Sequence, residues 1–125
     1  MEATVRAIMD TLSAMNIEPF VFVDRYQFTI SQEKEMMNLA FSCIDQSDFL
    51  IAETSEKAIG VGVEAGYAKA KQKPIIYMRS SGAEHSTTMA GASNYQVVYD
   101  NTGDLQIQLK DVLSKMIEGC LFKQP

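Results

Sequence analysis

The sequence predicts an α/β domain with a doubly wound, mainly parallel sheet of four strands, of the flavodoxin or Rossmann-like kind. Short apolar runs alternate with helical periodicities, glycine and proline fall singly at their borders, and 125 residues with 46% hydrophobic composition suffice for one core. Strands that alternate with helices lie parallel, because right-handed crossovers return the chain to the same end of the sheet. We expect residues 1–125 to form a single domain.

The first half of the chain alternates helical segments with apolar strand segments. Residues 3–15 place apolar side chains three and four positions apart, which is typical of an amphipathic helix. Residues 19–23 are a short run of β-branched and aromatic side chains, which predicts a buried strand. Ser31 is expected to cap a helix that runs to about residue 46, and residues 48–52 predict a second strand.

The second half repeats this alternation. A helix is expected at residues 60–73, a strand at 75–78 and a short helix within 79–94. A strand at 95–99 and a final helix at 105–119 follow. Lysines near the end of the first of these helices match its negative pole. Ligands of such sheets bind beyond the carboxyl ends of the strands, so the loops that follow the strands are the expected location of a site.

Composition and charge exclude several classes of protein. A formal net charge of −5 repels phosphate backbones, so polymeric DNA or RNA is not an expected partner, although amides at a helix start can hold one small anionic group. No stretch reaches the roughly 18 to 20 apolar residues of a membrane span, and the N-terminus lacks the pattern of a signal peptide. We therefore expect a cytoplasmic protein without a membrane partner.

Side chains that usually build metal sites and catalytic triads are few. The single histidine, His85, and the two cysteines, Cys43 and Cys120, show neither metal-ligand spacing nor a CxxC pair. Mechanisms that need a histidine triad or a zinc cluster are therefore not expected. Neither a metal nor an organic cofactor is predicted.

The segment Gly60-Val-Gly-Val-Glu-Ala-Gly66 lies between the second strand and its helix, at the predicted ligand edge. Gly60 and Gly62 let a ligand approach the backbone without interference from Cβ atoms. Glu64 is expected in the first helical turn, where the helix dipole favours an ionised carboxylate. Such an anion suits glycosyl chemistry, in which the sugar develops positive charge at its anomeric carbon.

Two other interpretations of this segment remain open. An acidic residue in a first helical turn is often only a complement to the helix dipole. The segment also satisfies the GxGxx(G/A) pattern of dinucleotide-binding proteins, with Glu84 placed 20 residues beyond Glu64. That fingerprint normally occupies a tight first strand-to-helix turn, whereas a longer loop precedes this one.

Three segments in order carry a more specific pattern: a strand that ends in an acidic residue, a GxGxE helix start and a KP(I/V)(I/L) strand. They read Ser47-Asp-Phe-Leu-Ile-Ala-Glu53, Gly60-Val-Gly-Val-Glu-Ala-Gly-Tyr-Ala68 and Lys73-Pro-Ile-Ile76. Over residues 45–99 the chain thus resembles the nucleoside 2-deoxyribosyltransferase family, including its 2′-deoxynucleoside 5′-phosphate N-hydrolase-like members. The resemblance implies cleavage or transfer of an N-glycosidic bond in a (deoxy)nucleoside or its 5′-monophosphate.

The resemblance also implies roles for particular residues. Glu64 matches the catalytic glutamate that attacks the anomeric carbon in this family, and Gly60 and Gly62 would admit the substrate. Residues 81–92 match the phosphate-binding segment of the hydrolase, which places Ser86 at its phosphate-binding serine and Met89 among the substrate-binding positions. In that family this loop can serve the site of a neighbouring subunit. Without the resemblance, the loop could equally be a solvated segment that caps a short helix.

Three departures from the family pattern stand out. The first strand with its Gly/Ser-rich loop is missing, Ala40 replaces an aspartate of many relatives, and Ala58 replaces an Asp or Ser. The strand at 19–23 could pair with that at 48–52 to close the sheet. These losses leave a second function open, a catalytically impaired nucleotide-binding or assembly module. A missing central strand exposes apolar edge, so a homodimer or larger homo-oligomer is expected.

Overall fold

The computed structural model describes residues 2–19, 30–55 and 59–119. In chain order its elements are α1 (Glu2–Ala14), a 3₁₀ turn η1 (Ile30–Gln32), α3 (Glu33–Asp45), β1 (Leu50–Glu53), α4 (Ile59–Ala70), β2 (Ile75–Ser80), α5 (Thr87–Ala92), β3 (Tyr95–Tyr99) and α6 (Thr102–Glu118). Among these residues no helix has the length and apolar character that crossing a membrane requires.

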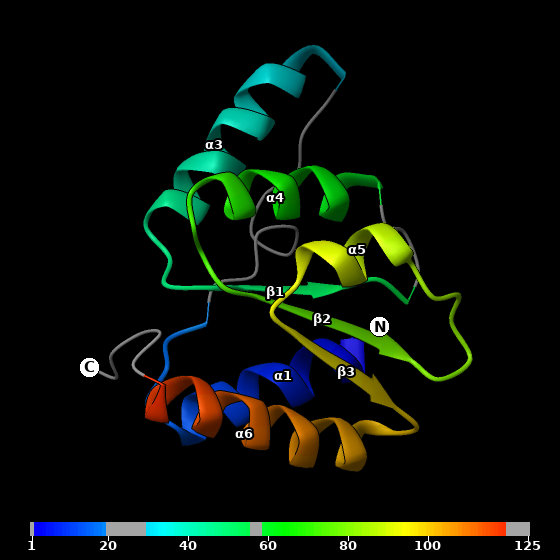
Figure 1. Ribbon diagram of the computed structural model, residues 1–125. Helices are drawn as coiled ribbons and strands as arrows, with labels where there is room; N and C mark the ends of the chain where they lie inside the picture. Colours follow the sequence, from blue (N-terminus) through cyan, green and yellow to red (C-terminus); the bar gives the residue numbers. More distant parts are fainter. Residues whose placement is uncertain (1, 20–29, 56–58, 120–125) are drawn as a thin grey trace.

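The three strands form one parallel sheet in the order β1-β2-β3. Helices α3, α4 and α5 lie over one face, and α1 and α6 cover the other (Figure 1). The predicted α/β architecture with a parallel sheet between helices is therefore confirmed. The fourth expected strand, at residues 19–23, and its proposed pairing with β1 fall almost entirely outside the described residues.

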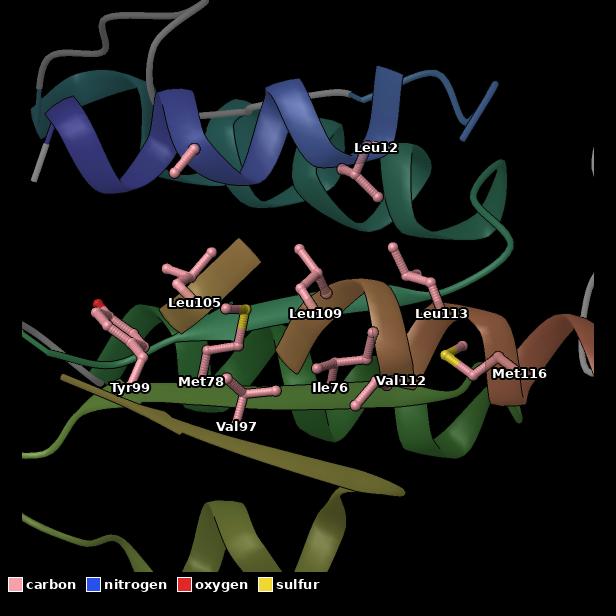
Figure 2. Close-up of a cluster of buried hydrophobic side chains, with 11 residues drawn as sticks. Leu12, Ile76, Met78, Val97, Tyr99, Leu105, Leu109, Val112, Leu113 and Met116 are labelled. Atoms are coloured by element: carbon pink, nitrogen blue, oxygen red, sulfur yellow. The ribbon is translucent and has the colours of Figure 1, made fainter. Parts of the chain in front are cut away.

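The larger core lies between the sheet and the α1–α6 pair (Figure 2). Apolar side chains recur on α6 at steps of three and four residues, so they share the face that meets the sheet. This face comprises Leu105, Leu109, Val112, Leu113 and Met116, all buried. They pack against inward-facing side chains of the strands, namely Ile76, Met78, Val97 and Tyr99. Leu12 of α1 completes the cluster.

A second core fills the space beneath α4 and α5. Small side chains at Ala65 and Ala68 face the sheet from α4, which permits a close approach of this helix to the strands. They pack against Ile75 and Tyr77 of β2 and Met89 of α5. This core supports the helices that border the carboxyl edge of the sheet.

Two predicted helix boundaries require correction. The residue that precedes α3 is Gln32, which makes no side-chain cap, and Ser31 lies in the 3₁₀ turn before it, so the predicted Ser31 cap is wrong. Helix α4 ends at Ala70, three residues earlier than expected. Gln72 adopts a left-handed conformation with φ of 61°, and the Lys73 amide bonds the Ala68 carbonyl at 2.9 Å, which closes the helix before Pro74.

Candidate functional site

A polar cavity of about 420 Å³ opens at the carboxyl edge of the sheet. Its lining comes from the end of β1 and from the loop that leads into α5, and comprises Thr54, Ser55, Glu84, His85, Ser86, Thr87 and Thr88. Ligands of parallel α/β sheets bind at this edge, so the cavity lies where the predicted strand order places a site. Every lining residue carries a polar side chain.

Ser86 holds the α5 side of the cavity in place. Its Oγ accepts a hydrogen bond from the Met89 amide at 3.1 Å, which makes Ser86 the N-cap of α5. Its own amide donates to the phenolic oxygen of Tyr77 at 2.9 Å. The capping role that the sequence allowed is thus present, and the Ser86 hydroxyl retains its hydrogen for donation to a ligand.

Thr54 is the most deeply buried residue of the cavity lining. The residue is 7% exposed, and its amide donates to the Met78 carbonyl at 2.9 Å, which continues the pairing of β1 with β2. Its Oγ1 has no hydrogen-bond partner within the described parts of the chain. A buried hydroxyl without a hydrogen-bond partner is rare and costs free energy in the folded protein. Sequence reasoning missed this residue.

A hydrogen-bond network on the other side of β1 fixes Ser55. The Glu53 carboxylate accepts the Ser55 amide at 2.6 Å and the Ser55 Oγ at 2.7 Å, and it also accepts the Tyr99 hydroxyl. Ser55 Oγ in turn accepts the Ser80 amide at 2.9 Å. The Glu53 carboxylate and the Ser55 hydroxyl together therefore join the carboxyl ends of all three strands at the border of the cavity.

Glu64 lies in the second turn of α4, because the helix begins no later than Ile59. Its side chain is partly exposed, and no hydrogen bond or ion pair connects it to another residue of the described segments. Burial raises the pKa of the Glu64 carboxyl above its ordinary value of 4.5. The expected first-turn position is therefore wrong, and burial shifts the pKa of the Glu64 carboxyl in the direction opposite to the expected stabilisation of its charge.

Glu64 lies on the side of α4 that faces α3. The negative charge of Glu64 contributes, after burial, to the raised pKa of the Cys43 thiol on α3. Tyr67, three residues after Glu64 and hence on the same face of α4, stacks on Phe41 of α3 with ring centroids 4.3 Å apart. The Tyr67 hydroxyl donates to both carboxylate oxygens of Asp45, at 2.8 and 3.0 Å.

Gly60 and Gly62 lie inside α4 rather than in a loop. A Cβ added at either position would meet no atom within 4 Å. Nothing within the described chain requires glycine at either position, and the approach of a ligand to the backbone there stays a prediction. A helical location also differs from the tight strand-to-helix turn of the dinucleotide fingerprint.

Two positions singled out from the sequence lie in the core. Met89 is 3% exposed and packs between α5 and β2, so burial removes it from contact with a ligand in the cavity. The predicted substrate contact of Met89 is therefore wrong for a ligand in this cavity. Ala40 is also 3% exposed, on the buried side of α3, and supplies no polar group. Ala58 lies outside the described residues.

The structure brings some of the predicted residues together and separates others. Ser86 lines the polar cavity, whereas Glu64 does not and instead neighbours α3. Thr54 and Ser55 join Ser86 in the cavity, although more than 30 residues separate them along the chain. The sequence feature that could have identified Thr54 is its position directly after a strand that ends in an acidic residue.

The fold is similar to that of a nucleotide N-glycosidase of known structure. CMP N-glycosidase BcmB of Clostridium botulinum superposes with a TM-score of 0.67 over 86% of this chain and 90% of that protein, at 17% sequence identity. This similarity establishes the shared α/β fold. No family model matches the sequence.

A curated relative is similar in sequence. The chain is 36% identical over 75 residues to the "Putative 2′-deoxynucleoside 5′-phosphate N-hydrolase 1" of Syntrophotalea carbinolica, which is 58% of this chain and 53% of that protein. The matched segment thus spans about half the length of the relative. The resemblance drawn from the sequence motifs is confirmed.

Proposed function

We propose that the protein cleaves or transfers the N-glycosidic bond of a (deoxy)nucleoside or its 5′-monophosphate, with Glu64 as the nucleophile. The observation that carries this proposal is the state of Glu64, a partly buried carboxyl without a partner in the described chain, next to open glycine backbone. Its raised pKa reflects poor solvation, which makes the ionised carboxylate more reactive toward a cationic sugar carbon. The named activities of the two similar proteins support the same reaction class.

The reaction follows a double displacement. An ionised Glu64 oxygen attacks the anomeric carbon, the bond from that carbon to the base nitrogen breaks, and the electron pair leaves with the base, which takes up a proton from solvent. Water then attacks the same carbon, the sugar–glutamate ester bond breaks, and the released proton returns to solvent. A second base in place of water gives transfer, and either route retains the anomeric configuration.

The site needs two copies of the chain in this proposal. Within one chain Glu64 does not line the cavity that contains Ser86. A neighbouring copy can supply the α5 loop, which is the arrangement that the family resemblance implies. The proposed active form is therefore a homodimer or a larger assembly in which Glu64 of one copy faces Ser86 of another.

Base release tests the nucleophile. The protein is incubated with deoxynucleosides and their 5′-monophosphates, with and without an acceptor base, and the free or exchanged base is measured by chromatography. Glu64→Gln is expected to lower the rate at least a hundredfold, because loss of a covalent nucleophile removes several kcal/mol of transition-state stabilisation. Glu35→Gln, which removes an exposed charge on α3, is the matched control. Equal background release by wild type and Glu64→Gln contradicts the proposal.

Complementation tests the shared site. Glu64→Ala and Ser86→Ala chains, each impaired alone, are mixed under conditions that exchange subunits. In a two-fold dimer, mixed pairs contain one intact site, so activity is expected to recover to about a quarter of the wild-type value. As a control, a chain that carries both substitutions is mixed with either single variant, and no recovery of activity is expected. A mixture that remains as inactive as its components rules out a site shared between copies.

A catalytically impaired nucleotide-binding module is the second candidate. Ala40 favours it, since a buried alanine stands where many relatives carry an aspartate that orients the sugar or activates the base. Loss of one group that acts only in the transition state lowers a rate by about a hundredfold or more. Saturable nucleoside binding without release of base would favour this candidate over the enzyme.

A further inference from the structure

We propose that the groove between α1 and α6 binds the same groove of a second copy of this chain. The groove has a volume of about 330 Å³ and takes its lining from both helices. Helices α1 and α6 cover one face of the sheet, and α3, α4 and α5 cover the other (Figure 1). The contact is therefore separate from the proposed shared site of Glu64 and Ser86, and it joins such dimers into a larger assembly.

An exposed isoleucine borders this groove. Ile107 of α6 is 73% exposed, whereas the other large apolar side chains of α6 are buried or pack against the core. Ala14 of α1 and Gly103 of α6 line the same groove, and neither has a long side chain that would keep another helix away. Transfer of the Ile107 side chain from water into an apolar contact favours association. The groove therefore offers apolar contact to the surface of a folded partner.

Two polar side chains in the lining form hydrogen bonds within the chain. Thr11 Oγ1 donates to the Ala7 carbonyl at 2.9 Å, and Gln106 Nε2 donates to the same carbonyl at 3.3 Å. The second bond joins α6 to α1, so it helps to fix the relative position of the two helices that form the groove. A surface whose shape is fixed before binding loses little conformational entropy when a partner docks on it.

Side chains of opposite charge border the groove on its two helices. Asp10 of α1 and Lys110 of α6 are both exposed, and neither forms an ion pair with a residue that the structure describes. A two-fold axis along the groove places α1 of each copy over α6 of the other and leaves the position of each residue along the groove unchanged. Asp10 of one copy then faces Lys110 of the other, twice in the same contact. This charge complementarity of the groove with itself favours a second copy as the partner.

Sedimentation velocity of the full chain over a range of concentrations tests the contact. Ile107→Glu places a charge in the apolar part of the contact, so it is expected to raise the dissociation constant of this association at least about tenfold and to halve the mass of the assembly. Ile30→Glu is the matched control, because Ile30 is 86% exposed and precedes α3 on the other layer. Thermal unfolding verifies that both variants are folded. Equal masses of wild type and Ile107→Glu at every concentration overturn the inference.

Two charge-reversed chains test the two-fold arrangement. Asp10→Lys leaves cations at both edges of the groove and Lys110→Asp leaves anions at both edges, so each variant alone is expected to associate at least about fivefold more weakly than wild type. An equimolar mixture is expected to recover wild-type association, because both charge pairs of the mixed contact are then opposite in sign. Glu35→Lys, on the exposed side of α3, is expected to leave association unchanged.

Two outcomes of this experiment contradict the inference. A mixture that associates no better than its components shows that the two charged residues do not face each other across a two-fold axis. A loss of thermal stability in both variants without any change in mass assigns the groove to another segment of the same chain.

These results are independent of the proposed reaction, because mass is measured without substrate and the groove contains no residue assigned to catalysis. Ile107→Glu is therefore expected to retain base release. If the charge-reversed chains recover association when mixed and no chain releases base, the enzyme proposal fails and the contact between grooves stands. If Glu64→Ala and Ser86→Ala chains complement each other while Ile107→Glu keeps the wild-type mass, the contact between grooves fails and the shared site stands.

Discussion

Tyr99, at the end of β3, donates its hydroxyl hydrogen to the Glu53 carboxylate at the end of β1, across the intervening strand β2. Burial, followed by the hydrogen bond to Glu53, raises the pKa of the Tyr99 phenol. Ser55 donates twice to the same carboxylate and thereby connects the start of the cavity to the sheet. The pair therefore stabilises the edge of the sheet that borders the cavity.

Tyr99→Phe is expected to lower the free energy of unfolding by about 1 to 2 kcal/mol, because it removes a donor from a partly buried carboxylate. Tyr95→Phe is the matched control, since Tyr95 packs against the same core and its hydroxyl bonds no other described residue. Chemical denaturation of the two variants measures the difference. Equal destabilisation would mean that the hydrogen bond from Tyr99 to Glu53 contributes no more to stability than the hydroxyl of Tyr95 does.

Thr54→Val is expected to leave stability unchanged or to raise it by about 1 kcal/mol in the ligand-free protein, since it replaces an unpaired buried hydroxyl with a methyl group. Thr11 provides the opposite case at similar burial, because its Oγ1 donates to the Ala7 carbonyl at 2.9 Å. Thr11→Val should lower stability by about 0.5 to 1.5 kcal/mol. Urea denaturation compares both, and a larger loss in Thr54→Val than in Thr11→Val would reveal a hydrogen bond at Thr54.

Glu64 makes stability depend on pH in an unusual direction. Its pKa in the folded protein lies above the ordinary value of 4.5, so between these two pKa values the folded state keeps a proton that the unfolded state has released. Its contribution to stability is therefore present below 4.5 and is lost as the pH rises through the folded pKa. The stability of Glu64→Gln relative to wild type is expected to increase from about pH 4 to about pH 8.

Denaturation curves at several pH values measure this trend, with Glu35→Gln as an exposed control. The same titration should govern catalysis, because only the ionised carboxylate can attack the sugar. The rate of base release is therefore expected to rise with pH through the pKa of Glu64. A Glu64→Gln variant that gains no relative stability with pH would indicate that the carboxyl is well solvated.

The sequence predicted the order of the elements because apolar runs and helical stripes alternate without ambiguity. Strand β3 agrees with the prediction to the residue, and Gly119 caps the end of α6 as predicted, although α6 begins at Thr102, three residues before the first residue of the predicted helix. The end of α4 was placed too late, because a Schellman closure with Gln72 in place of glycine leaves no obvious signal.

The site was less predictable than the fold. The position of Glu64 along the motif was clear, but the raised pKa of its carboxyl depends on burial, which no local pattern specifies. Thr54 gains its importance only when a loop 30 residues later closes over it. Met89 could be matched to a binding segment in sequence, yet the short helix α5 turns its side chain into the core.

The glycines of α4 offer a test that separates folding from function. Gly62 and Gly66 both have helical backbone, and an added Cβ would meet no atom within 4 Å at either position. Gly62→Ala and Gly66→Ala should therefore each stabilise the isolated chain by about 0.5 to 1 kcal/mol, since alanine is the better helix former. If Gly62 admits the substrate, Gly62→Ala is expected to lose most of its base-release activity while Gly66→Ala keeps it. Thermal unfolding and the chromatographic assay measure both properties in the same samples. A Gly62→Ala variant that is more stable and fully active would show that the open backbone at Gly62 serves no ligand, and it would leave Glu64 without the approach that the proposed reaction requires.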